Sequence, residues 1–234
     1  MSRRAPDPDH PAPRPVQVDG LCDAARTFLS QPSGRLLGAQ AAVLAAIRAT
    51  QGRPDRVDTA IVAGVVLWWP LQEWLAHRFI LHAPPRRVLG RTIDPEVARM
   101  HRAHHADPWH NTGLPMSFLV PAVPVHAAVW VALTRNRRRA LTGMLAFGTT
   151  TLAYEWTHFL THTSHRPKRS YFRTLQRRHR LHHFKDEHHW LGFTVPYVDD
   201  LFRTAPDPST IATSPTVRTL GVEDESLEAV PAGA

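Results

Sequence analysis

The sequence contains a single cysteine, Cys22, among its 234 residues. One thiol cannot form an internal disulfide framework, a CxxC redox pair or a thiolate zinc ribbon. Any metal ion bound by this chain must therefore be held by nitrogen, assisted by carboxylates. The length allows one domain with a substantial core.

The N-terminal segment lacks the apolar stretch of a secretory signal. Its first residues, MSRRAPDPDHPAPRP, are polar and rich in proline, so we expect no cleaved leader. Composition also predicts disorder over residues 1–34 and over a C-terminal tail, 204–234, that is rich in Pro, Ser, Thr and acidic residues. Residues 35–203 are predicted to form the single folded domain.

Acidic residues are outnumbered by basic ones. The 28 Lys and Arg and 20 Asp and Glu give a formal net charge of +8. This balance favours contact with nucleic acid or with an anionic membrane surface. No nucleic-acid-binding module with interleaved aromatic residues is visible, so we expect no nucleic-acid partner and attribute the charge to contact with lipid head groups.

Formal charge is absent from residues 114–134, LPMSFLVPAVPVHAAVWVALT. These 21 positions are long enough to cross a hydrocarbon layer of about 30 Å. Residues 59–82 and 140–160 are also largely apolar, and a weaker stretch covers 36–47. The low mean hydropathy of the chain favours buried core helices in a soluble bundle, but the uncharged segment and the tryptophans at segment ends favour a bilayer. We therefore predict an all-α integral membrane helical bundle.

Histidine is abundant, with 16 residues, and ten of them fall in four clusters. On a helix, residues three or four apart share a face, so the spacings H-x2-HH and H-x3-H predict convergent imidazoles. The spacing H-x4-H separates its rings by roughly 140° and needs a helix end or a π-bulge to converge. The clusters contain His77, His82, His101, His104, His105, His158, His162, His179, His182 and His183.

Chain topology would bring these clusters to one side of the bundle. If 114–134 and 140–160 form a hairpin that turns at 135–139, their outer ends lie together. Fourteen Lys and Arg lie on that side between Arg78 and Lys185, against four in the turn. The positive-inside rule then places the histidine cap in the cytoplasm, and we expect a bacterial-type inner membrane.

Ten histidines exceed the roughly four ligands of one zinc ion and would suffice for two ions. Imidazole suits zinc, copper, iron and nickel, so ligand type leaves the metal open. Nearby carboxylates would accept hydrogen bonds from ligand histidines, although each is equally an ordinary cap or surface residue. These candidates are Glu73, Asp107, Glu155 and Asp186. The part played by four histidines outside the pattern stays open, namely His110, His165, His188 and His189.

The histidine motifs resemble those of the fatty acid hydroxylase superfamily, which includes sterol desaturases, membrane fatty acid 2-hydroxylases and carotenoid hydroxylases. The resemblance covers residues 70–203 and is carried by EWLAHRFILH, HRAHH, YEWTHFLTH, and RRHRLHH followed by LGF. It implies a membrane helical bundle with a cytosolic cap that holds a histidine-ligated dimetal centre. Two iron ions occupy this centre in the working oxygenases, and zinc can occupy it in isolated protein.

By analogy with the membrane fatty acid 2-hydroxylases, the ten histidines divide into two ligand sets. One metal ion would be held by His77, His82, His101, His105 and His182. The other would be held by His104, His158, His162, His179 and His183. Tyr154 matches the aromatic residue of the third motif, whereas Glu155 stands where aspartate is common and Phe159 where tyrosine is common.

The implied reaction is hydroxylation of a lipid, with a fatty acyl chain as the leading substrate, dioxygen as cosubstrate and two electrons from a separate donor such as a ferredoxin. The catalytic group is the dimetal centre itself, with no separate acid or base assigned. The aromatic candidates for the substrate path are Phe79, Trp156, Phe159 and Trp190, although for each of them packing or membrane anchoring is the favoured interpretation.

Two kinds of alternative stay open. The motifs do not separate hydroxylation from desaturation, or a fatty acyl substrate from a sterol or carotenoid. From a different class, the protein would be a non-catalytic metal-binding or metal-transport membrane protein. Transport predicts ligands near the bilayer midplane, whereas these clusters lie at segment ends.

Overall fold

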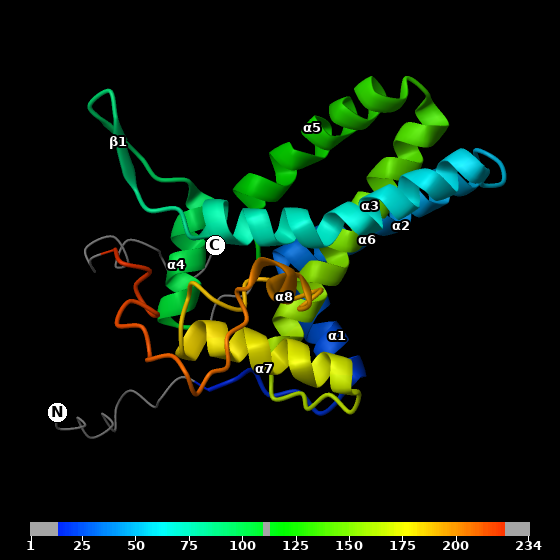
Figure 1. The fold of residues 1–234 in the computed structure, drawn as a ribbon. Coiled ribbons are helices and arrows are strands. Elements are labelled where there is room, and N and C mark those ends of the chain that lie inside the picture. The colour runs from blue at the N-terminus through cyan, green and yellow to red at the C-terminus, as the bar shows by residue number, and fades with distance from the viewer. Residues whose placement is uncertain (1–13, 110–112, 223–234) are drawn as a thin grey trace.

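The computed structural model describes residues 14–109 and 113–222, and this part of the chain is mostly helical (Figure 1). The long helices are α2 (Pro32–Ala49), α3 (Arg56–Ala76), α5 (Met116–Thr134) and α6 (Arg137–Thr161). The shorter ones are α1 (Leu21–Ser30), α4 (Glu96–Ala106), α7 (Ser170–Phe184), α8 (Val198–Phe202) and a π-helical turn, η1 (His77–Leu81). Strands β1 (Arg86–Val88) and β2 (Arg91–Ile93) form an antiparallel hairpin. The prediction of a helical fold is confirmed, with this hairpin as an addition.

Helix α6 is the central element of the fold, since it contacts α1, α2, α3, α5 and α7. Figure 1 shows the long helices α2, α3, α5 and α6 extending toward one side of the molecule, and we call this part the arm. Helices α4, α7 and α8, with η1 and the loops around them, gather at the other end and form what we call the cap. The fold is thus divided into two parts that share α6.

Local sequence explains where the arm helices begin and end. The Asp55 side chain accepts hydrogen bonds from the Val57 and Asp58 N–H groups in a capping box that starts α3. Arg135 has a left-handed conformation, φ 47°, and ends α5, while the Asn136 side chain caps α6. The expected hairpin between the two apolar segments is therefore present, with its turn at these two residues.

A buried ion-pair network ties three arm helices together at the end away from the cap. The Arg48 guanidinium donates to Asp58 at 2.8 Å and to the Thr142 hydroxyl at 2.7 Å, and Arg138 also donates to Asp58. Arg48 and Asp58 are both buried. Since a buried charge is stable only when it is paired, this network fixes how α2, α3 and α6 meet.

Among the described residues, one helix, α5, is long and apolar enough to cross a membrane. The only fully buried residue of α5 is Leu119. The segments 59–82 and 140–160, which we also expected to span a membrane, lie in α3, η1 and α6, and neither long helix meets the same criterion. The reason is composition, because polar residues interrupt the apolar run of each helix, with Gln72 and Glu73 in α3 and residues 149–151 and Glu155 in α6.

Two segments expected to be disordered are partly folded. Residues 21–30 form α1, in which Ala24 and Phe28 pack against Phe159 of α6. Residues 204–222 run over the cap, where Val217 is buried. Composition alone does not show these distant packing partners. Residues 1–13 and 223–234 lie outside the described part of the chain, and the domain boundaries stay a prediction.

The contact between α5 and α6 gives a test of the arm. An added Cβ at Gly143 of α6 would lie 2.3 Å from carbons of the Trp130 ring on α5. Gly143→Ala is therefore expected to lower the free energy of unfolding by about 1–3 kcal/mol, measured as thermal unfolding in detergent. Gly64→Ala is the matched control, because nothing lies within 4 Å of its added Cβ, and it should be neutral or stabilising. Equal stability of the two variants would contradict this packing.

Candidate metal centre

The cap brings ten histidines together in two groups of five. The first histidine group is His77, His82, His101, His105 and His182. The second histidine group is His104, His158, His162, His179 and His183. Within each group the candidate ligand nitrogens all lie within 4.8 Å of one another, and nine of the ten residues are buried. The membership is the same as in the division implied by the resemblance; the binding of metal ions stays a prediction.

The π-helical turn η1 explains how His77 and His82 reach the same group. On an α-helix these two side chains would point roughly 140° apart. In η1 the His82 N–H donates to the His77 carbonyl at 3.2 Å, five residues back, and the two ring centroids lie 4.8 Å apart. The helix irregularity that the spacing required is therefore present at the site, where π-bulges are often found.

Helices α4 and α7 each contribute histidines to both groups. On α4, His104 belongs to the second group and His105 to the first. On α7, His182 belongs to the first group and His183 to the second. Neighbouring residues on an α-helix point about 100° apart, so each adjacent pair reaches two sites. This geometry explains the repeated His-His pairs in the sequence.

The Nε2 atoms of each group converge on one another. In the first group, His105 Nε2 lies 3.1 Å from His182 Nε2, and His77 Nε2 lies 3.2 Å from His101 Nε2. In the second group, four Nε2–Nε2 distances range from 2.7 to 3.1 Å. A neutral imidazole carries one N–H, so such a contact is a hydrogen bond only if one Nε2 holds the proton.

Backbone carbonyls fix where that proton lies in the first group. The Nδ1 atoms of His77, His105 and His182 lie 2.6, 3.0 and 2.8 Å from carbonyl oxygens. These carbonyls belong, in the same order, to Leu191, Val217 and His189. A carbonyl only accepts, so each Nδ1 donates and each Nε2 presents a lone pair. His105 and His182 therefore direct two lone pairs at each other, an arrangement that a cation between them would stabilise.

A short loop after α7 carries two of these three carbonyls. Trp190 has φ 54°, which is unusual for a bulky residue, and its two neighbours offer their carbonyls to His182 and His77. Residue 192 of this loop is a glycine that packs closely on α8. A Cβ added there would lie 2.2 Å from Val198 Cγ1, so a larger side chain does not fit without a shift. Strained backbone of this kind is found where a site over-determines it, and here it aims two acceptors at two ligand histidines.

Two buried carboxylates hold the loop in place. Asp199 accepts N–H hydrogen bonds from residues 191 and 192 at 2.9 and 3.0 Å. Glu73 accepts N–H hydrogen bonds from residues 193 and 194 at 2.7 and 2.9 Å. Glu73 was a candidate partner for a ligand histidine, and the structure shows it bonded instead to the loop that carries the histidines' carbonyl partners. Asp199 was missed, and the only sequence signal was an acidic residue shortly after Trp-Leu-Gly-Phe.

The other three candidate carboxylates accept hydrogen bonds from backbone N–H groups. Glu155 accepts from the Leu114 N–H at 3.1 Å. Asp107 and Asp186 accept N–H groups two residues further along the chain, at 3.2 and 2.8 Å. In the hydrogen bonds that the structure shows, these three carboxylates accept from backbone N–H groups, which lie two residues away for Asp107 and Asp186 and 41 residues away for Glu155. Backbone carbonyls instead accept from the Nδ1 atoms of His77, His105 and His182.

The histidines outside the repeating pattern do not join either group in the described residues. His165, His188 and His189 belong to neither, although the His189 carbonyl contacts His182. His110 lies outside the described part of the chain.

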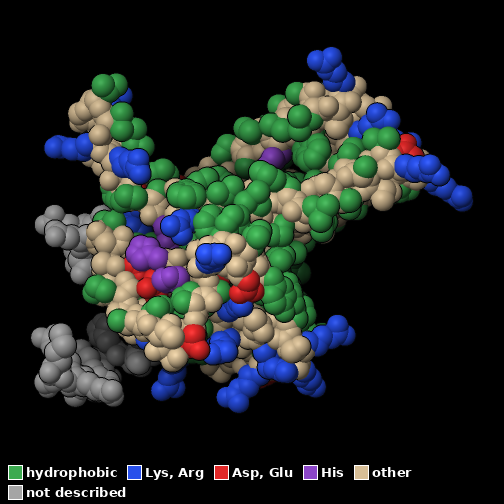
Figure 2. Space-filling view, in the orientation of Figure 1, with side chains coloured by type: hydrophobic (Ala, Val, Ile, Leu, Met, Phe, Trp, Pro, Cys, Tyr) green, Lys and Arg blue, Asp and Glu red, His purple; other side chains and the backbone are tan. Residues whose placement is uncertain are grey.

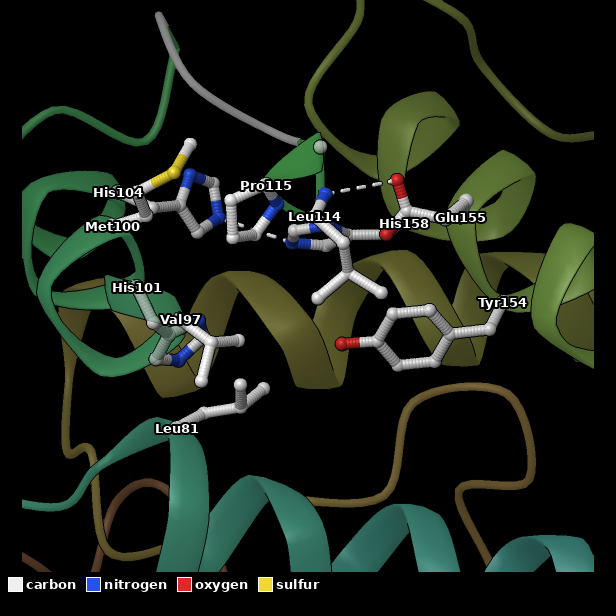
Figure 3. Close-up of a pocket in the computed structure, with 11 residues that line it drawn as sticks. Leu81, Val97, Met100, His101, His104, Leu114, Pro115, Tyr154, Glu155 and His158 are labelled. Carbon is white, nitrogen blue, oxygen red and sulfur yellow. Dashed lines mark hydrogen bonds between the residues drawn. The ribbon is translucent and has the colours of Figure 1, made fainter. Parts of the chain in front are cut away.

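A cavity of about 20 Å³ lies beside the histidines where the cap meets the arm (Figure 3). Its lining contains Leu81, Val97, Met100, His101, His104, Gly113, Leu114, Pro115, Tyr154, Glu155 and His158. Figure 3 shows the Tyr154 hydroxyl pointing into this space, with Leu81 and Val97 on the same side as His101. The volume suits about one water-sized molecule.

The four aromatic candidates for a substrate path are absent from this lining, and the favoured interpretation of packing or surface anchoring fits their positions. Trp156 and Phe159 pack around Phe28 of α1. Trp190 is buried in the loop after α7, and Phe79 lies on the surface with 62% of its area exposed. Among described residues, the aromatic side chain that reaches the cavity is Tyr154.

Burial favours the neutral form of the cap histidines. Desolvation lowers the pKa of His105 to about 3 and lowers the pKa of His182 and His183 well below the usual value, with neighbouring histidines adding to the effect. Only a neutral imidazole binds a metal ion. The cap therefore provides its histidines in the ligating form.

The fold and the site together define a helical domain with two adjacent five-histidine groups, and comparison with known proteins assigns its family. Residues 62–204 match the fatty acid hydroxylase family. This match covers more than half of the chain. The chain belongs to the fatty acid hydroxylase family.

The individual proteins that this chain resembles are named as hydroxylases. The chain is 30% identical over 149 residues to the dihydroceramide fatty acyl 2-hydroxylase FAH2 of Arabidopsis thaliana, covering 62% of this chain and 60% of that protein. It is 29% identical over 153 residues to a fatty acid 2-hydroxylase of Rattus norvegicus, covering 64% of this chain and 41% of that protein. A solved structure of full-length scs7p, in which only the hydroxylase domain is visible, has a similar fold, with a TM-score of 0.58 at 20% identity over 82% of this chain and 68% of that chain.

The lowered histidine pKa values predict how stability depends on pH. Below the ordinary histidine pKa of about 6.5, the unfolded chain takes up protons that the buried histidines cannot. Thermal unfolding of metal-free protein should therefore show stability that is full above this pH and falls as the pH drops toward the folded-state pKa values.

Matched variants identify the groups responsible for this pH dependence. The double variant His105→Gln/His182→Gln should flatten the dependence. His188→Gln, at a side chain that is 71% exposed, should leave it unchanged. Wild-type stability that stays constant on acidification would be inconsistent with neutral buried histidines.

The role of Asp199 can be tested by removing its carboxylate. Asp199→Ala leaves two buried N–H groups without an acceptor and should lower the free energy of unfolding by about 2–4 kcal/mol. It should also speed the loss of bound zinc to a chelator, because the loop carbonyls that face His77 and His182 are no longer held. Asp200→Ala is the control, since that side chain is 48% exposed. Equal zinc release from both variants would rule out this role.

Proposed function

We propose that this chain is a membrane-bound lipid hydroxylase that holds two iron ions in its cap. The observation that carries the proposal is the pair of buried five-histidine groups with converging Nε2 atoms. Family membership supports the reaction class, and the names of the relatives favour a fatty acyl chain as substrate. The chain covers 60% and 41% of the length of the two relatives described above.

The donor set fits two metal ions of the kind that imidazole binds. In the first group the carbonyl partners leave lone pairs on Nε2 pointing inward, as a ligand requires. In the second group, the Nδ1 atoms of His162, His179 and His183 are buried and have no hydrogen-bond partner among described residues. Hydrogen bonds to the backbone would therefore hold the rings of the first group more firmly in orientation than those of the second group.

The proposed reaction inserts one oxygen atom of dioxygen into a C–H bond. When bound, the two iron ions supply the redox chemistry by which R–H, O2, two electrons and two protons give R–OH and H2O. A separate donor such as a ferredoxin provides the electrons. The chain's own residues keep the ten rings dry and in fixed orientation, which is the protein's part in cofactor chemistry.

The cavity beside the histidines is the proposed position of the reacting C–H bond. It lies between Tyr154, Val97 and the two groups, at the boundary of cap and arm. An acyl chain is larger than this space, so binding requires side chains of the lining to move aside. Leu81 and Val97 would then present apolar surface to the chain.

We propose that the arm lies in the bilayer of a bacterial-type inner membrane, with the cap on the cytoplasmic side. Figure 2 shows hydrophobic side chains over much of the arm and Lys and Arg at its far end and around the cap. Exposed apolar residues on arm helices include Leu67, Trp68 and Leu133. Large exposed apolar surfaces mark contact with a membrane or a partner, and α5 has the length of a span.

Lipid mass spectrometry under isotope-labelled dioxygen tests the proposed function. Cells expressing the chain with a suitable reductant should contain a lipid that has gained one labelled oxygen atom. His182→Ala/His183→Ala should abolish this product, because it removes one ligand from each group. His188→Ala, outside both groups, should retain it.

Other outcomes would change the assignment. Loss of two hydrogens without incorporation of label would identify a desaturase. A wild-type lipid profile identical to that of the double variant, in protein loaded with two iron ions and supplied with reductant, would count against an oxygenase acting on the lipids of that host.

A further inference from the structure

The β1–β2 hairpin projects from the body of the protein. The two strands pair in the register Arg86 with Ile93 and Val88 with Arg91. All six strand residues are exposed, and the principal contacts of each strand are with the other strand. The hairpin therefore buries no core of its own, and a hairpin of this size is marginal in water.

The tip of the hairpin is unusual in both conformation and exposure. Leu89 has φ 49° and Gly90 has φ 76°, the two positive angles of a type I′ turn. The first position of such a turn ordinarily carries Asn, Asp or Gly, and a bulky residue is strained there. Leu89 is also 98% exposed. The turn thus holds a large apolar side chain away from the rest of the protein.

The composition of the hairpin combines apolar and basic side chains. Val88, Leu89 and Ile93 are exposed apolar residues, and residues 86–93 contain three arginines and no acidic residue. Figure 2 shows hydrophobic side chains at the hairpin tip with Lys and Arg side chains around and below them. Apolar groups beside arginines are typical of segments that lie in the membrane–water interface.

The base of the hairpin is firmly fixed. Arg102 of α4 donates to both carboxylate oxygens of Asp94 at 2.7 and 2.6 Å and to the Ala83 carbonyl at 2.8 Å. Arg99 donates to the Asp94 carbonyl at 2.7 Å. Both ends of the hairpin segment are therefore attached to the helix that carries three of the ten histidines.

The hairpin lies at the level where the cap joins the arm. Figure 1 shows it leaving the cap between η1 and α4, beside the start of α5 and on the side away from α7. If the arm lies in the bilayer, this level is the cytoplasmic interface. The positive charge of the three arginines complements the phosphates of anionic lipids. An anionic lipid surface is therefore the binding partner that suits the hairpin.

We propose that residues 86–93 form an interfacial anchor, with Leu89 at the boundary of head groups and acyl chains and the arginines on anionic head groups. The inference rests on the proposed membrane position of the arm. Each arginine near such a surface favours binding by roughly fivefold. Through Asp94 and Arg102, the anchor would fix the depth of α4, and with it that of the cavity, relative to the lipid chains.

Site-specific fluorescence in lipid nanodiscs tests this proposal. The exposed Cys22 is first replaced by serine, and single cysteines at Leu89, Val129 or Phe172 are then labelled with an environment-sensitive dye. Val129 on α5 reports on the arm and Phe172 on α7 reports on the far side of the cap, and both are 45% exposed. Quenching by nitroxide-bearing lipids is measured in discs with and without an anionic phospholipid.

The proposal predicts that the Leu89 label is quenched well above the Phe172 label, and more strongly when anionic lipid is present. Replacing the three hairpin arginines with glutamine should remove the dependence on anionic lipid. Quenching of the Leu89 label equal to that of the Phe172 label, with the Val129 label quenched, would overturn the anchor and leave the membrane arm intact. An unquenched Val129 label would overturn the membrane position of the arm and the anchor with it.

Discussion

Ten imidazole rings meet in the cap, and nine of them bring their Nε2 atom to within 2.7–3.2 Å of the Nε2 atom of another ring. This close approach places strict demands on the surrounding structure. The rings must be neutral, and their lone pairs must point inward. Burial meets the first demand by lowering histidine pKa values such as that of His105. Loop carbonyls meet the second by accepting the Nδ1 protons of three rings. The facing lone pairs that result are the physical reason to place cations between them.

The loop after α7 holds two of those three carbonyls in position. The left-handed Trp190 turns two of them toward His77 and His182, and Asp199 and Glu73 fix the loop on either side of Gly192. The arm has a different character, since it exposes apolar side chains such as Leu67 and Leu133, and we propose that these face a bilayer. Helix α6 belongs to both parts, because one end joins the buried Arg48 network and the other carries His158. The cavity lies where the two parts meet.

Sequence spacing predicted the parts of the site that depend on local geometry. H-x2-HH places rings by the helical period, and H-x4-H correctly required the irregular turn at His77–Leu81. The sequence did not reveal the carbonyl partners, because every residue has a carbonyl and only the fold brings Val217 to His105 across 112 positions. Carboxylates such as Asp107 were chosen as partners because they are visible in a sequence. Helix α1 was missed for a similar reason, as its partner Phe159 is distant in the chain.

The central claim is that each five-histidine group binds one metal ion. Anomalous X-ray scattering from zinc-loaded protein tests it most directly, because zinc can be located independently of activity. The account predicts two peaks, one inside each group, with zinc–nitrogen distances of about 2.0–2.1 Å. A single peak shared by both groups, or zinc bound only outside them, would contradict the account.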